Sequence, residues 1–192
     1  MLSRAFPKTN ARYRKIIATL DERALYHYMK AGVYGRFPFK YFYRQAEKVE
    51  VETDLIIEPM NLDIHMDAIN RIDRNIINHE GEPIHDWVST TRDGFVYKRN
   101  AEIVGDGYVG SSSGPFTALD DNDFPSVLAH AESLMADRGE EFGAETPLIN
   151  TKAIQYFLAR KYQIDSFSAI LMSNVPFGKF ENCLCFSPEF FL

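Results

Sequence analysis

The chain has 192 residues and a mass of 22.0 kDa, enough for one domain of ordinary size, or one domain and part of a second. Its hydrophobic content of 45% and charged content of 25% are those of a globular protein, which excludes disordered, collagenous and coiled-coil classes. The net charge of −6 is unevenly divided. Residues 1–50 hold 11 Lys and Arg against 4 Asp and Glu, and the rest hold 10 against 23, so we expect the two parts to attract each other.

The first 53 residues predict a strand, a helix, a second strand and a linker. Apolar residues between Arg14 and Leu20 indicate a short strand, and a helix follows from Glu22 to about Ala31, with Gly32 as its stop. An aromatic strand is expected from Arg36 to Arg44, and the polar stretch Gln45 to Thr53 is the natural linker.

The aromatic strand has two possible uses. Its aromatic residues alternate with basic ones, as on a strand with two different faces: Phe37, Phe39, Tyr41 and Tyr43 against Arg36, Lys40 and Arg44. An exposed aromatic face would suit the stacked bases of single-stranded nucleic acid, whereas a covered face is part of a core. Covered faces are commoner, and the net charge of −13 on residues 51–192 would repel a phosphate backbone, so we expect no nucleic-acid partner.

Residues 54–119 predict a strand, a helix, a loop and an antiparallel meander. Apolar residues at helical spacing mark the helix, and tight turns separate the last three strands. The elements are the strand Asp54 to Met60, the helix Leu62 to Asn78, the loop His79 to Thr91, and the strands Gly94 to Arg99, Ile103 to Val109 and Gly114 to Leu119.

The remaining residues predict two helices and three strands. Asp120 to Asp123 followed by Pro125 is a helix start signal. The later elements are the strand Glu145 to Ile149, the helix Thr151 to Tyr162, and two closing strands, Ser166 to Met172 and Asn182 to Phe186, joined by a Pro-Phe-Gly turn. From Asp54 the order is βαβββαβαββ, which predicts an α+β fold.

Metal, disulfide and membrane classes are not expected. Cys183 and Cys185 are one residue apart on a predicted strand, so their thiols should lie on the same face as reduced core groups. The five histidines show no zinc-like spacing with them. No apolar run approaches the roughly 20 residues of a membrane-spanning helix, and no signal-peptide stretch is present. We expect a cytoplasmic protein without a membrane partner.

The sequence contains a weak internal repeat. A shift of 129 positions lays Asp21, Ala24, Tyr28, Gly32 and Val33 over Asn150, Ala153, Phe157, Lys161 and Tyr162. A strand, a helix and a second strand are therefore written twice, with helices of the same length.

The element order from Asp54, together with Asn150, Ala153, Phe157 and Tyr162, resembles the GCN5-related N-acetyltransferase (GNAT) superfamily. Asp21, Ala24, Tyr28, Gly32 and Val33 fit the family's helix pattern more closely than the second copy does. The chain thus resembles the C-terminal part of a tandem GNAT protein, with a partial copy in residues 1–48 and a complete copy in residues 51–192. The resemblance implies a mostly antiparallel central sheet flanked by helices in three layers.

The resemblance also implies where acetyl-CoA would bind. In the family the pantetheine arm enters between the fourth and fifth strands, here Gly114 to Leu119 and Glu145 to Ile149. The pyrophosphate lies on a glycine-containing loop that opens the next helix. Here the loop Asp120 to Phe124 has no glycine or basic residue but three aspartates. A helix N-terminus attracts an anion by about 0.3 to 1 kcal/mol, whereas each facing carboxylate costs about 1 to 4 kcal/mol, so repulsion should dominate. Alternatively, Asp121 or Asp123 caps the helix.

Two residues are candidates for roles taken from the family. Tyr28 matches the tyrosine that protonates the departing thiolate, whereas Phe157 stands at that position in the complete copy and has no proton to give. Tyr28 is equally a core aromatic on an apolar helical stripe. Asn150 is a cofactor-binding candidate that would contact pantetheine, or it caps the following helix. Glu145 and Asp106 lie on strands near the expected opening, but nothing in the sequence selects either as a general base.

Two functions remain open from the sequence. The first is an acetyl-CoA-dependent N-acetyltransferase whose amine acceptor, a small molecule or a peptide, is not identified. The second is a catalytically silent GNAT-shaped module for binding or oligomerisation, favoured by the aspartates and by Phe157. Because a strand-helix-strand fragment cannot bury its apolar faces alone, residues 14–44 should pack on the complete domain or on another chain, so a homo-oligomer is also considered.

Overall fold

The structure, a computed structural model, describes residues 14–185. Its helices are α2 (Glu22–Lys30), α3 (Leu62–Ile76), α4 (Glu82–Val88), α5 (Phe124–Arg138) and α6 (Thr151–Ala159), with short 3-10 helices η1 (Asp121–Asp123) and η2 (Phe180–Asn182). Its strands are β1 (Lys15–Thr19), β2 (Tyr34–Gln45), β3 (Ile56–Pro59), β4 (Asp93–Arg99), β5 (Glu102–Val109), β6 (Phe116–Ala118), β7 (Glu141–Pro147), β8 (Gln163–Ile164), β9 (Ala169–Ser173) and β10 (Cys183–Leu184). The expected α+β class is confirmed.

The strands form two antiparallel sheets. Sheet A has the order β1-β9-β2-β7, with β8 also paired to β2, and sheet B has the order β10-β6-β5-β4-β3. A bridge between Glu145 of β7 and Cys185 joins the two sheets next to β10. The predicted meander is confirmed as β4, β5 and β6.

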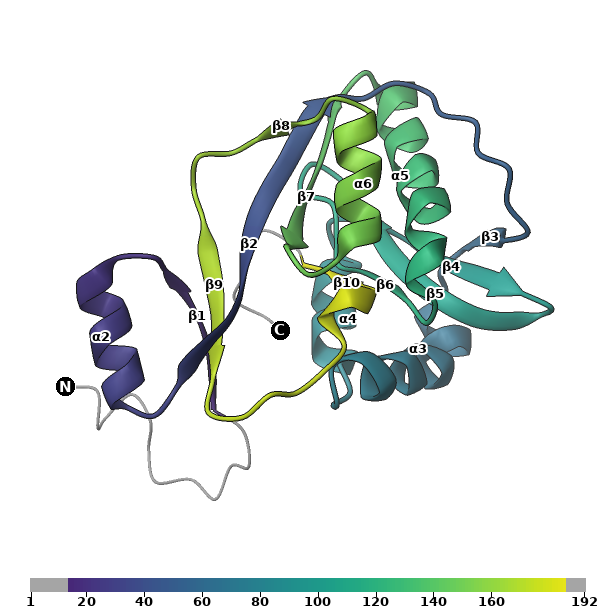
Figure 1. Ribbon diagram of the computed structural model, residues 1–192. Coiled ribbons are helices and arrows are strands. Elements are labelled where there is room, and N and C mark those ends of the chain that lie inside the picture. Colours follow the sequence, from purple (N-terminus) through teal and green to yellow (C-terminus); the bar gives the residue numbers. More distant parts are fainter. Residues whose placement is uncertain (1–13, 186–192) are drawn as a thin grey trace.

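Helices cover both faces of sheet B. On one face, α5 and α6 pack over a core that includes Phe116, Val127 and Phe157. On the other face, α3 packs over a second core with Val96 and Ile72. Figure 1 shows α5 and α6 side by side over one face and α3 and α4 on the opposite side. Val96 and Tyr97 are neighbours on β4 whose side chains enter different cores, as strand alternation requires.

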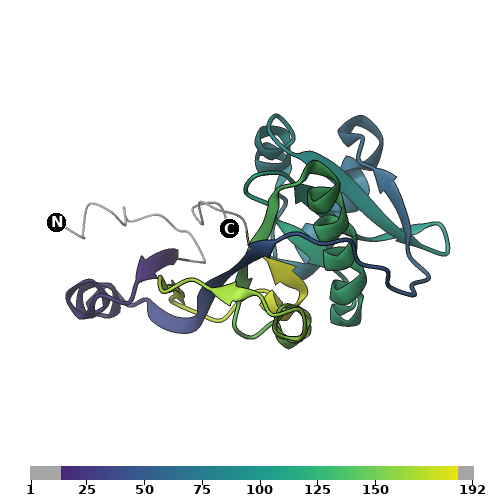
Figure 2. The same cartoon turned by 90° about the horizontal axis from the view of Figure 1, so that it is seen from above.

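The N-terminal arm, residues 14–45, is built into sheet A. Its aromatic strand β2 lies between β7 and β9 and pairs with both, and β1 pairs with β9. Phe37 and Phe39 are buried in the α3-side core, and Tyr41 and Tyr43 are half-buried. The expected packing of residues 14–44 on the rest of the chain is confirmed. Figure 2 shows the arm reaching away from the body, with α2 at its end.

Several predicted elements differ from those in the structure. The predicted loop His79 to Thr91 is wrong, because it contains α4, whose buried His85 and Val88 attach it to the core. The strand predicted at Glu145 to Ile149 is β7, which begins four residues earlier because Gly139, with φ of 72°, ends α5. The two closing strands do not lie in one sheet: β9 belongs to sheet A and β10 to sheet B.

Within the described residues, no helix is both long and apolar enough to cross a bilayer. Cys183 and Cys185 are buried and belong to the same core, which confirms that their side chains lie on one face. Among residues 14–185, no group of histidine, cysteine and acidic side chains has the arrangement of a metal site.

Candidate functional site

The groove between β6 and β7 is occupied by the chain itself. Cys183 and Leu184 of β10 pair with Thr117 and Phe116 of β6, and the Cys185 N–H donates to the Glu145 carbonyl of β7 over 2.9 Å. β10 thus forms backbone contacts with both walls. Leu184 is fully buried, so the strand fills the space between the walls.

Two buried asparagines hold this segment at its entrance. The Asn182 side-chain amide donates to the carbonyls of Ala118, at 2.7 Å, and Leu119, at 3.2 Å, where β6 ends. Asn150 caps α6, because its Oδ1 accepts from the Ala153 N–H over 3.0 Å, and its Nδ2 donates to the Cys183 carbonyl over 3.4 Å. Asn150 therefore serves as the predicted cap and also touches the strand that fills the groove.

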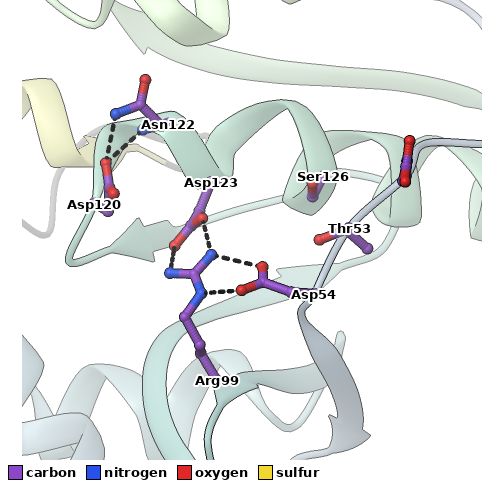
Figure 3. Close-up of a pocket in the computed structure, with 8 residues that line it drawn as sticks. Thr53, Asp54, Arg99, Asp120, Asn122, Asp123 and Ser126 are labelled. Carbon is purple, nitrogen blue, oxygen red and sulfur yellow. Dashed lines mark hydrogen bonds and ion pairs between the residues drawn. The ribbon is translucent and has the colours of Figure 1, made fainter.

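A cavity of about 480 Å³ lies beside the loop between β6 and α5 (Figure 3). It is lined by Glu52, Thr53, Asp54, Arg99, Asp120, Asn122, Asp123 and Ser126. Four of these side chains are carboxylates and one is a guanidinium, so the lining is acidic. Three of the lining residues, Glu52, Thr53 and Asp54, belong to the segment between β2 and β3. The sequence gave no reason to place this segment beside the loop.

Arg99, at the end of β4, is held between two carboxylates (Figure 3). Its guanidinium donates to Asp54 at 2.6 and 2.9 Å and to Asp123 at 2.7 and 3.1 Å. The Asp54 hydrogen bonds, followed by those of Asp123, raise the pKa of Arg99, and the Arg99 hydrogen bond lowers the pKa of Asp54. The Arg99 guanidinium beside the loop is therefore already paired. Arg99 and Asp54 are 45 residues apart, so sequence spacing gave no signal for the pair.

The prediction that Asp121 or Asp123 caps the helix is confirmed only for position: Asp123 is the N-cap residue of α5, but its side chain makes no capping hydrogen bond. Asp120 makes the capping contact instead: its Oδ1 accepts from the Asn122 backbone N–H over 3.0 Å at the start of η1. Asp123 precedes α5 but makes no side-chain cap, because Arg99 takes both of its carboxylate oxygens. The Asn122 hydrogen bonds also lower the pKa of Asp120, so this carboxylate stays charged.

The predicted candidates Tyr28 and Asn150 are not brought together. Tyr28 lies on α2, half-buried against a small cluster with Ala18, Val33 and Met172. Asn150 lies at the start of α6, next to β10. Phe157 is fully buried and stacks on Phe42 of β2 with ring centroids 5.0 Å apart. The position of the family's tyrosine in the complete copy is therefore part of the core.

Glu145 and Asp106 both lie in the interior. Glu145 is 7% exposed, next to Tyr41, whose pKa is raised by burial and then by the charge of Glu145. Asp106 is fully buried on β5, where Thr117 donates to its Oδ1, and its Oδ2 has no hydrogen-bond partner among the described residues. Burial raises the pKa of Asp106 to about 6 against the opposing charge of His85.

The structure contains a buried histidine cluster that the sequence did not predict. His85 of α4 contacts Asp73 of α3 through Nε2, at 3.0 Å, and the Tyr108 hydroxyl of β5 through Nδ1, at 2.8 Å. All three residues are buried. Asp73 lies on α3, and His85 lies 12 residues later on α4. Because α4 was predicted as a loop, the sequence gave no reason to place His85 against α3.

No protein-family model and no curated protein matches the sequence. Solved structures do match. A candidate acetyltransferase from Pyrococcus horikoshii superposes with a TM-score of 0.63 at 15% identity, covering 88% of this chain and 55% of that one. A GCN5-related N-acetyltransferase from Sphaerobacter thermophilus superposes with a TM-score of 0.55 at 10% identity, covering 84% and 59%. The chain has the GNAT fold. It spans little more than half the length of these two proteins.

Acetyl-CoA does not fit the GNAT groove as it stands here. The path that the resemblance assigns to the pantetheine arm, between β6 and β7, contains β10 and the Asn182 amide. The loop that would take the pyrophosphate carries Asp120 and Asp123, and Arg99 is paired with Asp54 and Asp123. Both the shape of the groove and the charge at its entrance therefore oppose the cofactor.

Proposed function

We propose that this chain is a GNAT-fold module for binding or assembly that is catalytically silent at the groove between β6 and β7. The observation that carries the proposal is β10, which pairs with β6 and is bridged to β7 where a cofactor arm would pass. The core position of Phe157 supports it, because this side chain has no proton to give to a leaving thiolate. We also propose that residues 1–48 and 51–192 are a partial and a complete copy of one domain.

The second candidate function is an acetyl-CoA-dependent N-acetyltransferase. It is favoured by the superposition on proteins described as acetyltransferases, at 10 to 15% identity. It requires β10 to leave the groove, because the strand and the cofactor arm cannot share the space between the two walls. The two candidates therefore differ in whether the groove accepts acetyl-CoA once β10 is loosened.

Calorimetric titration with acetyl-CoA separates the two candidates. For the unaltered chain we expect no heat of binding up to millimolar ligand. Asn182→Ala removes the two side-chain hydrogen bonds to Ala118 and Leu119, and Cys185→Pro removes the N–H that donates to Glu145. If the module is silent, neither variant gains affinity. Micromolar binding by the unaltered chain would overturn the proposal, and micromolar binding by the variants alone would favour the acetyltransferase.

A matched control tests whether loosening β10 acts through the groove. Asn122→Ala removes a side-chain hydrogen bond to Asp120 outside the groove, and it should leave acetyl-CoA binding as in the unaltered chain. Circular dichroism of each variant shows whether the fold survives. The Cys185→Pro variant carries the larger risk of unfolding, and Asn182→Ala then decides the result.

A further inference from the structure

Strand β1 is an open edge of sheet A. It pairs with β9 on one side, and no described strand lies on its other side (Figure 1). Just before β1, the Asn174 N–H donates to the Arg14 carbonyl over 3.1 Å. Because hydrogen-bonded pairs alternate along an antiparallel ladder, Ile16 and Ala18 also bond to β9. The backbone N–H and carbonyl groups of the other residues of β1 therefore point away from β9: Lys15, Ile17 and Thr19.

This edge lacks the features that keep other sheet edges from pairing. β1 contains no proline and no bulge, and its one charged residue is Lys15. The Lys15 ammonium is turned toward the body of the same chain, where Nζ lies 3.1 Å from His79 Nε2 and 5.6 Å from the centroid of the Phe177 ring. By contrast, β3 at the edge of sheet B carries Glu58 and ends in Pro59. Charge and proline commonly protect an edge strand, so β1 is left able to pair.

The outward groups of β1 are complementary to those of a second copy. They are spaced evenly on both sides of Ile17, so a two-fold axis at Ile17 places β1 antiparallel to its copy. Ile17 then lies opposite Ile17 of the second copy, and Lys15 lies opposite Thr19. In this register each outward N–H meets a carbonyl of the other copy. One pairing therefore satisfies every open backbone group of the edge.

The charges at the two ends of β1 also suit a second copy. Arg14, before the strand, is exposed, and its guanidinium contacts a backbone carbonyl and no described carboxylate. After the strand come two exposed acids, Asp21, which pairs with Arg23, and Glu22. In the register above, Arg14 lies opposite Leu20 of the second copy, two residues from its Glu22. The basic start of each strand thus meets the acidic end of the other, whereas a parallel pairing would bring like charges together.

Helix α2 leaves an apolar surface beside the same edge. It is amphipathic, yet none of its residues is buried. Leu25 packs on the face of β1 that carries Ile16 and Ala18, while Tyr26 and Met29 are 62% and 45% exposed. A two-fold axis perpendicular to the sheet places both α2 helices on the same face, one on each side of the axis. Because the arm reaches away from the body, a second copy has access to this surface (Figure 2).

We propose that this chain forms a two-fold dimer in which the β1 strands of two copies pair antiparallel about Ile17 and join their A sheets into one. The partner is a second copy because both the outward backbone groups and the end charges of β1 are complementary to themselves. The dimer goes beyond the function proposed for the groove. β1 and β7 lie at opposite ends of the order of sheet A, so the pairing needs no change in the groove.

Light scattering coupled to size exclusion tests the dimer. We expect twice the monomer mass of 22.0 kDa at high micromolar concentration, and dissociation on dilution. Ile17→Pro removes the central outward N–H and no hydrogen bond within the chain, and edge strands tolerate such a proline. It should raise the dissociation constant about thirtyfold, because each dimer loses two hydrogen bonds. Ile17→Ala is the matched control: it keeps the N–H and should change the dissociation constant by less than about tenfold.

Charge variants test the register. Arg14→Glu places an acid beside the acidic end of the second strand, so it should weaken the dimer about threefold to tenfold, most strongly at low salt. Adding Glu22→Arg restores opposite charges and should restore the dissociation constant. Arg71→Glu is the control, because Arg71 is an exposed arginine on α3, outside the proposed interface, and its replacement should leave the dimer unchanged.

Hydrogen exchange provides a second readout, at single amides. The amides of Lys15, Ile17 and Thr19 should be protected in the dimer and lose this protection on dilution. The amides of Ile16 and Ala18, which bond to β9, should stay protected in both states. This pattern and the Arg14→Glu result decide the matter if circular dichroism shows that Ile17→Pro does not fold.

Three results would overturn the proposal. The first is a chain that stays monomeric up to its highest soluble concentration, including one whose β1 edge binds a strand of another protein instead. The second is a dimer whose dissociation constant is unchanged in a folded Ile17→Pro variant, because its interface then lies elsewhere. The third is a dimer in which the outward amides of β1 exchange as fast as in the monomer.

Discussion

Single residues that join distant segments hold much of this molecule together. Glu132 of α5 is fully buried and accepts hydrogen bonds from the Tyr156 hydroxyl of α6 at 2.7 Å and from Arg160, the C-cap residue of α6, at 2.7 and 2.9 Å. It also accepts from the Glu47 N–H of the linker, at 3.2 Å. One carboxylate thus connects two helices and the segment between the sheets.

Replacing Glu132 with alanine should strongly destabilise the fold. The change leaves the Arg160 guanidinium and the Tyr156 hydroxyl without their buried acceptor, which typically costs about 3 to 5 kcal/mol. Urea unfolding followed by circular dichroism measures the loss. Asp137→Ala is the control on the same helix, because Asp137 pairs with Lys48 on the surface and should cost less than about 1 kcal/mol. Equal losses for both variants would contradict the role given to Glu132.

The sequence could not supply these residue pairs. Arg99 and Glu132 each meet partners at least 24 residues away, and nothing in local periodicity links such positions. By contrast, Asn150 was predicted as a helix cap, because a cap depends only on the next three residues. The roles of Tyr28 as a catalytic residue and of Asn150 as a cofactor ligand stay predictions.

At the level of elements, the helices α2 and α6 have matching ends. Their bounds differ by 129 positions at both ends, and Asp21 and Asn150 cap them at equivalent places. Both helices end in a left-handed residue, Gly32 with φ of 81° and Lys161 with φ of 61°. The internal repeat therefore extends to backbone geometry, although the left-handed residue that follows the helix is glycine in one copy and lysine in the other.

Substitutions at the two left-handed positions should change the free energy of unfolding in opposite directions. A left-handed conformation costs a residue with a Cβ about 1 kcal/mol, so Lys161→Gly should stabilise the protein by about that amount and Gly32→Ala should destabilise it similarly. Lys161 is exposed, so little packing is lost. Thermal unfolding of both variants measures the difference, and Lys161→Ala is the control, because it removes the same side chain but keeps the Cβ and should not stabilise the protein. A loss of stability in Lys161→Gly would refute the argument.

Helices and strands with strong periodicity were predictable, and α4 was not. The apolar stripe of α3 predicted which face of the helix is buried, and Ile69, Ile72 and Ile76 are buried as their spacing requires. α4 has only two buried positions, His85 and Val88, and Gly81 and Pro83 around its start are also typical of loops. Its helical form comes from the contacts with Asp73 and Tyr108, which the sequence does not display.

At the level of the whole molecule, residues 14–45 and strands from the last third of the chain share one sheet. β2 is flanked by β7 and β9, and ion pairs such as Lys48 with Asp137 link the basic N-terminal residues to the acidic body. The expected attraction between the two parts is consistent with this pairing. The opposite charges thus meet where the arm passes onto α5.

Removal of residues 1–49 should cause aggregation. Without β2, the facing edges of β7 and β9 lose their pairing, and Phe157 loses the ring of Phe42 that covers it. We expect the shortened chain to bind a hydrophobic dye and to elute from size exclusion as soluble aggregates. Removal of residues 1–13 alone serves as the control. A monomeric shortened chain with native circular dichroism would show that the arm is dispensable.

The central place of β2 also sets the order of events during synthesis. The ribosome delivers this strand before β7 and β9, because 95 residues separate Gln45 from the start of β7, and β9 comes later still. Until then, Phe37, Phe39 and Phe42 have no partner strands to cover them, and pairing over such sequence distances is slow. A nascent chain of this kind is a natural client for chaperones that shield aromatic segments as they emerge.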